Sequence, residues 1–184
     1  ADNNVDIQEF MIEPVGFTSF SEALRCGAEI FHSLKSVLKS QDLNTAVGDE
    51  GGFAPAVSSN EETFDLLTEA VTMAGYTLGQ DIVFGIDSAA TEFFQDGFYN
   101  LKKENKVLSS DELIAFYQDL AARHPIRSFE DVLAEDDWAG FKKFTDTFNW
   151  EVQVVGDDLY VTNVKRLERG IAEKTTNSIL IKLN

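Results

Sequence analysis

The sequence predicts an α/β fold in which a parallel sheet is covered by helices, and three observations lead to this prediction. Short apolar runs of strand length alternate along the chain with segments of helical periodicity. These runs are almost continuously apolar, as strands are when helices cover both faces of a parallel sheet. Acidic residues directly follow several of the runs, at the point where each strand should end.

Composition and charge indicate a folded domain and argue against several classes of partner. The 184 residues include 15 Lys and Arg against 32 Asp and Glu, a net charge of −17, and 43% are hydrophobic. Such a charge argues against binding to nucleic acid or anionic lipid. The length predicts about one domain, and we expect neither a membrane span nor a signal peptide. A single cysteine, Cys26, fits a reducing compartment, so we expect a cytoplasmic protein.

Three helices are predicted from capping boxes, in which a serine is followed three residues later by a glutamate. The pairs are Ser19 with Glu22, Ser59 with Glu62, and Ser109 with Glu112. Apolar residues at helical spacing follow each pair. We therefore expect a helix over residues 20–39, a second that stops at Gly75 and a third that ends before Pro125. Shorter helices are expected over about residues 138–147 and 164–174.

The apolar runs between these helices are the predicted strands. They cover residues 82–86, 126–129, 152–155 and 178–181, and a small hairpin arm is expected at residues 98–101. Residues 6–12 form a further predicted strand, which two helices follow before the next strand begins. The order is therefore β-α-α, followed by βα repeats.

Charged residues follow the successive strands at intervals of about one βα repeat. They are Asp87, Glu130, Asp157 and Lys182. Parallel strands bring such positions to one rim of the sheet, and the C-terminal rim of an α/β barrel is where chemistry occurs. Three carboxylates there form a hard oxygen site that suits Mg²⁺. We expect nearby cations to lower the pKa of Lys182. The alternative for each single acid is a plain N-cap of the next helix.

Two further segments carry candidate polar residues. The glycine-rich stretch at residues 47–55 contains Glu50, and its glycines permit close approach to a ligand. Its alternative interpretation is a plain helix–helix turn. Gln8 and Glu9 lie in the first predicted strand, where they could also be outward-facing polar residues.

These residues belong to a series of motifs that closely resembles enolase, the phosphopyruvate hydratase of glycolysis. The motifs are collinear and extend over the whole chain: residues 8–11 (QEFM), 48–52 (GDEGG), 87–94 (DSAATEFF), 128–131 (SFED), 134–138 (AEDDW), 156–159 (GDDL), 161–163 (VTN) and 180–184 (LIKLN). The resemblance implies a partial (β/α)8 barrel of the TIM type, with six of eight strands. Residues 1–184 would belong to the C-terminal catalytic domain, without the N-terminal domain and the last repeats.

The resemblance also implies a function and roles for individual residues. The parent enzyme would be a Mg²⁺-dependent lyase that reversibly dehydrates 2-phosphoglycerate to phosphoenolpyruvate, commonly as a homodimer. Asp87, Glu130 and Asp157 would hold the metal. Lys182 would remove the α-proton of the substrate, and Glu50 would assist loss of the hydroxide.

The substrate would lie against Gln8, Glu9 and Lys182, and against the metal ligands Glu130 and Asp157. Glu13 departs from the family, which usually has an apolar residue at that position. Two alternatives remain open: a non-catalytic fragment or surface-binding form of enolase, possible because the family also has cell-surface and secreted pools, and a Schiff-base lyase that uses Lys182.

Overall fold

The computed structural model describes residues 4–48 and 50–183, so Asp49 and Asn184 of the motifs at 48–52 and 180–184 lie outside the described residues. The elements alternate as the sequence predicts. In chain order they are β1 (Glu9–Pro14), α1 (Phe20–Ser40), α2 (Asn60–Met73), β2 (Ile82–Asp87), the short 3-10 helix η1 (Ala90–Phe93), β3 (Phe94–Gln95), β4 (Phe98–Leu101), β5 (Lys106–Leu108), α3 (Ser110–Arg123), β6 (Ile126–Glu130), α4 (Trp138–Thr147), β7 (Gln153–Gly156), α5 (Val164–Glu173) and β8 (Ser178–Ile179).

The main sheet has five strands in the order β1-β2-β6-β7-β8. Strand β1 runs antiparallel to β2, and all other neighbours in this sheet are parallel. Within residues 4–48 and 50–183, β1 and β8 are its two edges, so the sheet is open. The predicted α/β class and the β-α-α opening are confirmed. The expected number of six strands is wrong, since five of the described strands form this sheet.

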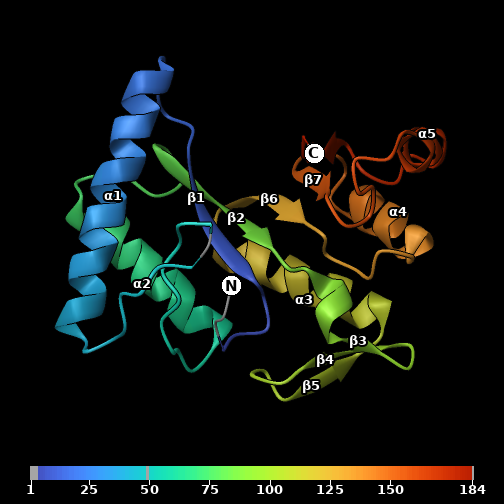
Figure 1. Ribbon diagram of the computed structural model, residues 1–184, viewed down its shortest axis with the longest axis horizontal. Helices are drawn as coiled ribbons and strands as arrows, with labels where there is room; N and C mark the ends of the chain where they lie inside the picture. Colours follow the sequence, from blue (N-terminus) through green and yellow to red (C-terminus); the bar gives the residue numbers. More distant parts are fainter. Residues whose placement is uncertain (1–3, 49, 184) are drawn as a thin grey trace.

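The helices pack around this sheet in two groups (Figure 1). Helices α1 and α2 pack against each other and against β1, whereas α3 packs against β6 and α4. The predicted hairpin arm is confirmed as a separate sheet of β3, β4 and β5. No helix among the described residues combines the length and the apolar character needed to cross a membrane.

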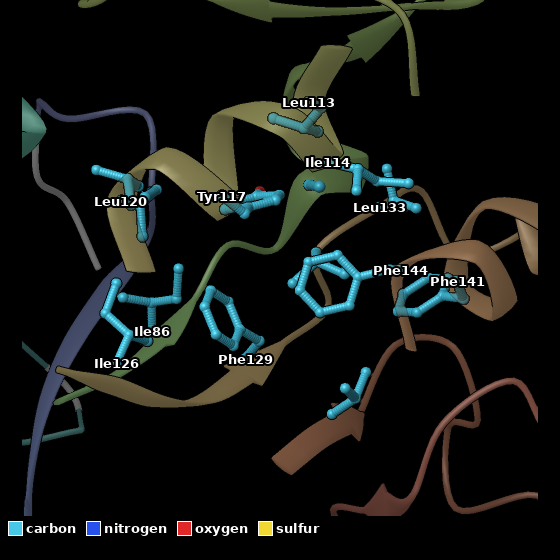
Figure 2. Close-up of a cluster of buried hydrophobic side chains, with 14 of the residues drawn as sticks. Ile86, Leu113, Ile114, Tyr117, Leu120, Ile126, Phe129, Leu133, Phe141 and Phe144 are labelled. Atoms are coloured by element: carbon cyan, nitrogen blue, oxygen red, sulfur yellow. The ribbon is translucent and has the colours of Figure 1, made fainter. Parts of the chain in front are cut away.

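An aromatic cluster forms the centre of the larger hydrophobic core, between β6 and the helices α3 and α4 (Figure 2). Phe129 of β6 points toward Tyr117 of α3 and Phe144 of α4, with ring centroids 6.1 and 5.3 Å away. All three side chains are fully buried, and the rings meet edge to face, the arrangement that aromatic pairs prefer. This packing fixes β6, whose last residue is Glu130.

A second core lies between α1, α2 and the start of β2. Its buried residues include Cys26 and Ile30 of α1, Val71 of α2 and Ile82 of β2. Cys26 is completely buried there and packs as a small apolar side chain. Phe53 of the glycine-rich loop packs against the edge of this core.

The predicted helix starts are confirmed, but the predicted capping boxes are complete at one helix of the three. Each cap serine accepts the N–H of the glutamate three residues later. At α3 the Glu112 carboxylate also accepts from the Ser109 N–H at 2.8 Å, which completes the box. At α1 Glu22 accepts from the hydroxyl of Ser19 instead, and at α2 the glutamate accepts from the N–H of Ser58. Each of these two helices therefore starts with a serine cap that lacks the reciprocal bond from the cap N–H to the glutamate.

Two strands differ from their predicted bounds by more than one residue at an end. The first begins at Glu9 and extends to Pro14, where residues 6–12 were expected. Strand β8 contains two residues, so Lys182 lies three positions beyond its end. Strand β8 is in register with β7 at Ser178 and Ile179, and the flanking Asn177 and Leu180 donate their N–H groups to the carbonyls of Val154 and Gly156.

Glu13, the residue that departs from the family pattern, lies below the rim on the same face of the sheet as Asp87. It hydrogen-bonds to Ser128, and burial raises the pKa of its carboxyl. A Cβ atom on Gly85 would lie 2.5 Å from Glu13 Oε1, so the missing side chain of this glycine makes room for the carboxyl.

Candidate functional site

A row of carboxyl side chains crosses three neighbouring strands at one end of the sheet. Glu9 of β1 is in register with Asp87, and Asp87 is in register with Glu130. Side chains alternate between the two faces of a strand, so the preceding residues Ile86 and Phe129 point into the larger core. Because Asp87 and Glu130 are the last residues of β2 and β6, both carboxyls reach the rim.

Asp157 lies near the same rim, and Asp131 lies between it and the other carboxyls. The residue of β7 in register with Glu130 comes two positions before Asp157, so Asp157 lies beyond the end of the strand. One oxygen each from Asp87, Glu130 and Asp131 lies within 4.8 Å of the others, and Asp131, Asp157 and Asp158 form a second such group. Asp131 therefore links the two halves of the predicted metal site.

Burial and crowding raise the pKa values of three of the rim carboxyls, those of Asp87, Glu130 and Asp131. Burial is the main cause at Glu130, whose pKa is raised to about 8, with added repulsion from Asp87 and Asp131. Burial also raises the pKa of Asp87 to about 7, although the Ala89 N–H donates to its Oδ1 at 2.9 Å. At Asp131 burial raises the pKa to about 6. A cation among these groups would favour their charged forms.

Lys182 forms an ion pair with Asp157 at this rim. The distance from Lys182 Nζ to Asp157 Oδ2 is 2.6 Å, and the two side chains are 60% and 14% exposed. The Lys182 N–H donates to Thr162 Oγ1 at 3.0 Å, which holds the backbone beyond β8. The hydrogen bond to Asp157 raises the pKa of Lys182. The expected lowering of this pKa by nearby cations stays a prediction, because the raised pKa belongs to the ion pair with Asp157 alone.

Glu50 lies at the turn of a short hairpin within the glycine-rich segment. Val47 and Phe53 form an antiparallel bridge on its two sides. The Gly51 N–H donates to the carbonyl of Gly48 at 3.0 Å, and Gly51 has a φ of 91°, a conformation that favours glycine. This backbone pairing differs from the plain helix–helix turn considered above.

The hairpin is anchored on both of its sides. The ring of Phe53 stacks on Phe31 of α1, with centroids 4.4 Å apart. Further along, the side chain of Asn4 donates to the carbonyl of Val57 and accepts from the N–H of Val57, both at 3.0 Å. These contacts hold the segment that carries Glu50 between α1 and the residues before β1.

Glu50 meets Glu9 at the rim. Burial raises the pKa of Glu9, and the charge of Glu50 and a hydrogen bond with it raise this pKa further, whereas the charge of Lys182 lowers it. Gln8 is half-buried and directly precedes β1. The candidate acid, the candidate base and Glu9 thus lie within electrostatic reach of one another.

The donor set fits a divalent cation. It consists of carboxylate oxygens alone, the type of ligand that Mg²⁺ prefers. Burial and the neighbouring carboxyls raise the pKa values of Asp87 and Glu130, and a bound cation would favour the charged form of both. Asp131 was missing from the predicted ligands, although the acids are doubled at 130–131 and 157–158 in the sequence. That doubling was the available signal for a second layer of acids.

Comparison with known families agrees with this arrangement. The family model described as the enolase C-terminal TIM barrel domain matches residues 1–184, which is the whole chain. The match covers the strands that carry the rim carboxyls, the hairpin with Glu50 and the segment with Lys182.

Proposed function

The chain belongs to the enolase C-terminal TIM barrel family, and on that premise we propose that it forms part of the catalytic barrel of a phosphopyruvate hydratase. The reaction is the magnesium-dependent, reversible dehydration of 2-phosphoglycerate to phosphoenolpyruvate in glycolysis. The 184 residues are then one portion of the barrel domain in a longer enzyme, which acts in the cytoplasm as a homo-oligomer, commonly a dimer in the family.

The metal ligands in this proposal are Asp87, Glu130 and Asp157. The close approach of their oxygens, directly or through Asp131, supports the assignment. A magnesium ion bound there supplies positive charge that offsets the charge developing on the substrate carboxylate. The acidic rim could not otherwise accept an anionic substrate, since the carboxyls would repel it.

Lys182 is the proposed base. It takes the proton from the carbon next to the substrate carboxylate, and the released electron pair forms the new double bond. To act in this way the amine must first lose its own proton, which the ion pair with Asp157 stabilises. A cation held by Asp157 would compete with Lys182 for that carboxylate and would favour the neutral amine.

Glu50 is the proposed acid. It gives a proton to the departing hydroxide at the neighbouring carbon, so that water leaves and the charges balance. The closeness of Glu50 to Glu9 supports this role, because the charge of Glu50 raises the pKa of Glu9 and so favours a proton on the pair. Gln8 and Glu9 lie beside it and are proposed to contact the substrate at its hydroxyl end.

The observation that carries the proposal is that Glu50 and Lys182 lie within electrostatic reach of each other beside the rim carboxyls Glu9 and Asp157. Acid and base act on different bonds, so their variants should differ. In the full-length enzyme, Lys182→Ala should abolish exchange of the substrate α-proton with solvent. Glu50→Gln should slow dehydration about 10²–10⁴-fold while exchange remains measurable.

The experiment records α-proton exchange in D₂O by NMR together with phosphoenolpyruvate absorbance. Lys142→Ala is the matched control, because Lys142 lies on α4 and pairs with Asp146. Both rates should stay unchanged in that variant. Equal loss of exchange in Glu50→Gln and Lys182→Ala would contradict the separate roles.

A non-catalytic role for the 184-residue chain by itself is the second candidate. The exposure of Lys182 and the two-residue pairing of β8 favour it, since neither encloses a substrate. Turnover by this exact chain would exclude that candidate. A Schiff-base lyase has less support, because the surrounding carboxyls keep Lys182 protonated, and borohydride trapping with a carbonyl substrate would test it.

A further inference from the structure

Asp131 makes an unusual set of contacts just behind the proposed metal ligands. Its side chain is 4% exposed. Its Oδ2 accepts the N–H of Asp158 at 2.8 Å, and its Oδ1 accepts the N–H groups of Asp157 at 3.1 Å and Leu159 at 3.5 Å. Three successive N–H groups after β7 therefore converge on one carboxylate.

The backbone of Asp131 joins the ends of the neighbouring strands. Its N–H donates to the carbonyl of Val155 in β7 at 3.2 Å, and its carbonyl accepts the N–H of Ala90 after β2 at 3.0 Å. Asp131 adopts a positive φ of 42°, which is strained for a residue with a side chain. This conformation turns the chain at the end of β6 so that the carboxylate faces the segment after β7.

We infer that Asp131 is a positioning residue, whose carboxylate holds the backbone of residues 157–159 so that Asp157 points at the metal. The inference rests on the proposed function, because it takes Asp157 as a ligand. Both oxygens of Asp131 already accept hydrogen bonds from backbone N–H groups. Those donors would have to be given up, at least in part, if Asp131 itself moved to bind the ion.

The three N–H donors of residues 157–159 require a carboxylate as their acceptor. An anion satisfies three N–H donors with its two oxygens, and hydrogen bonds to a charged acceptor are stronger than neutral ones. An asparagine would turn an NH₂ group toward at least one of these N–H donors, so that two donors would face each other. Asp131→Asn should therefore release the segment while keeping the size of the side chain.

The test compares Asp131→Asn with Asp137→Asn in the full-length protein. Asp137 is a suitable control because it also caps backbone, accepting the Gly140 N–H at 2.9 Å at the start of α4, and it belongs to neither carboxylate group at the rim. Magnesium affinity is measured by titration calorimetry. Amide hydrogen exchange at residues 157–159 is measured without magnesium, which gives a readout independent of activity and of the metal.

Asp131→Asn should weaken magnesium binding about 10–100-fold, as is typical of residues that support a ligand. It should also speed exchange at residues 157–159 by about tenfold. Asp137→Asn should lower the melting temperature and leave both quantities unchanged. A residue with a merely structural role would lower the melting temperature in the same way as the control.

Unchanged magnesium affinity in Asp131→Asn, with normal binding by the wild type, would overturn this inference alone. A wild-type protein that fails to bind magnesium would overturn the metal site of the proposed function, and the inference with it. If the variant does not fold, the wild type still decides. If the wild-type amides of residues 157–159 exchange without protection, the Asp131 carboxylate does not hold them.

Discussion

Lys182 Nζ lies 2.6 Å from Asp157 Oδ2, so the proposed base is bound to a proposed metal ligand. The lysine and a cation are alternative partners for that carboxylate. As long as the ion pair persists, the pKa of Lys182 stays raised and the amine keeps its proton. Activation of the base and occupation of the metal site are therefore coupled through one side chain.

The first prediction concerns this coupling. Magnesium binding should lower the pKa of Lys182, because it withdraws Asp157 from the ion pair and adds positive charge nearby. NMR titration of the lysine side chain in the full-length protein, with and without magnesium, measures the shift. Asp157→Asn should lower the same pKa without metal. A pKa that magnesium leaves unchanged would disprove the coupling.

The second prediction concerns the ligands themselves. Asp87→Ala, Glu130→Ala and Asp157→Ala should each weaken magnesium binding by more than the ~10–100-fold that is typical of supporting residues, and should abolish turnover. Titration calorimetry of the full-length variants measures the affinity. Asp136→Ala serves as control, since the Asp136 side chain is 83% exposed and pairs with Arg166. Wild-type affinity in all three variants would remove the metal assignment.

Much of the frame around this site could be predicted from the sequence, since its signals are local. A serine before an apolar helical pattern located α1, α2 and α3, and acids at strand ends located Asp87 and Glu130. The role of Asp131 depends instead on a positive φ and on three N–H groups some 26 residues away in the chain. Contacts of that kind arise from how the loops meet in space, and no spacing rule contains them.

The third prediction concerns pH. The pKa values of Asp87 and Glu130 are raised to about 7 and about 8, from ordinary values of 3.8 and 4.5. The folded protein therefore retains protons that the unfolded chain releases above about pH 4.5. The stability that these retained protons contribute is fully present below the ordinary pKa values of the two groups and is lost as the pH rises through 7 and 8.

Without magnesium, the melting temperature of the full-length protein should fall between pH 5 and pH 8, and magnesium should stabilise it increasingly over the same range. Thermal scans at fixed ionic strength test both trends. The double variant Asp87→Asn and Glu130→Gln should flatten the metal-free trend. A wild-type profile equal to that of the double variant would contradict the assignment of these protons.

The fourth prediction concerns the isolated 184 residues. Several apolar side chains at and beside β8 are exposed, with Ile171 at 69%, Ile181 at 62% and Leu183 at 96%. Each Å² of apolar surface left in water forgoes about 25 cal/mol, against a typical domain stability of ~5–15 kcal/mol. The chain alone should be inactive and either loosely packed or prone to aggregate. Thermal unfolding and phosphoenolpyruvate absorbance test this prediction. A chain that unfolds cooperatively as a monomer and shows turnover would contradict it.

The two hydrophobic cores have a consequence for how such a site can evolve. The rim carboxyls lie on strands that pack against the aromatic core around Phe129. The hairpin with Glu50 packs instead, through Phe53, against the core beneath α1. Substitutions in one core can therefore adjust the proton donor while the cation site keeps its geometry. The proposed proton donor and the proposed cation ligands thus rest mainly on different packing, with Ile12, Leu34 and Leu78 in contact with both cores.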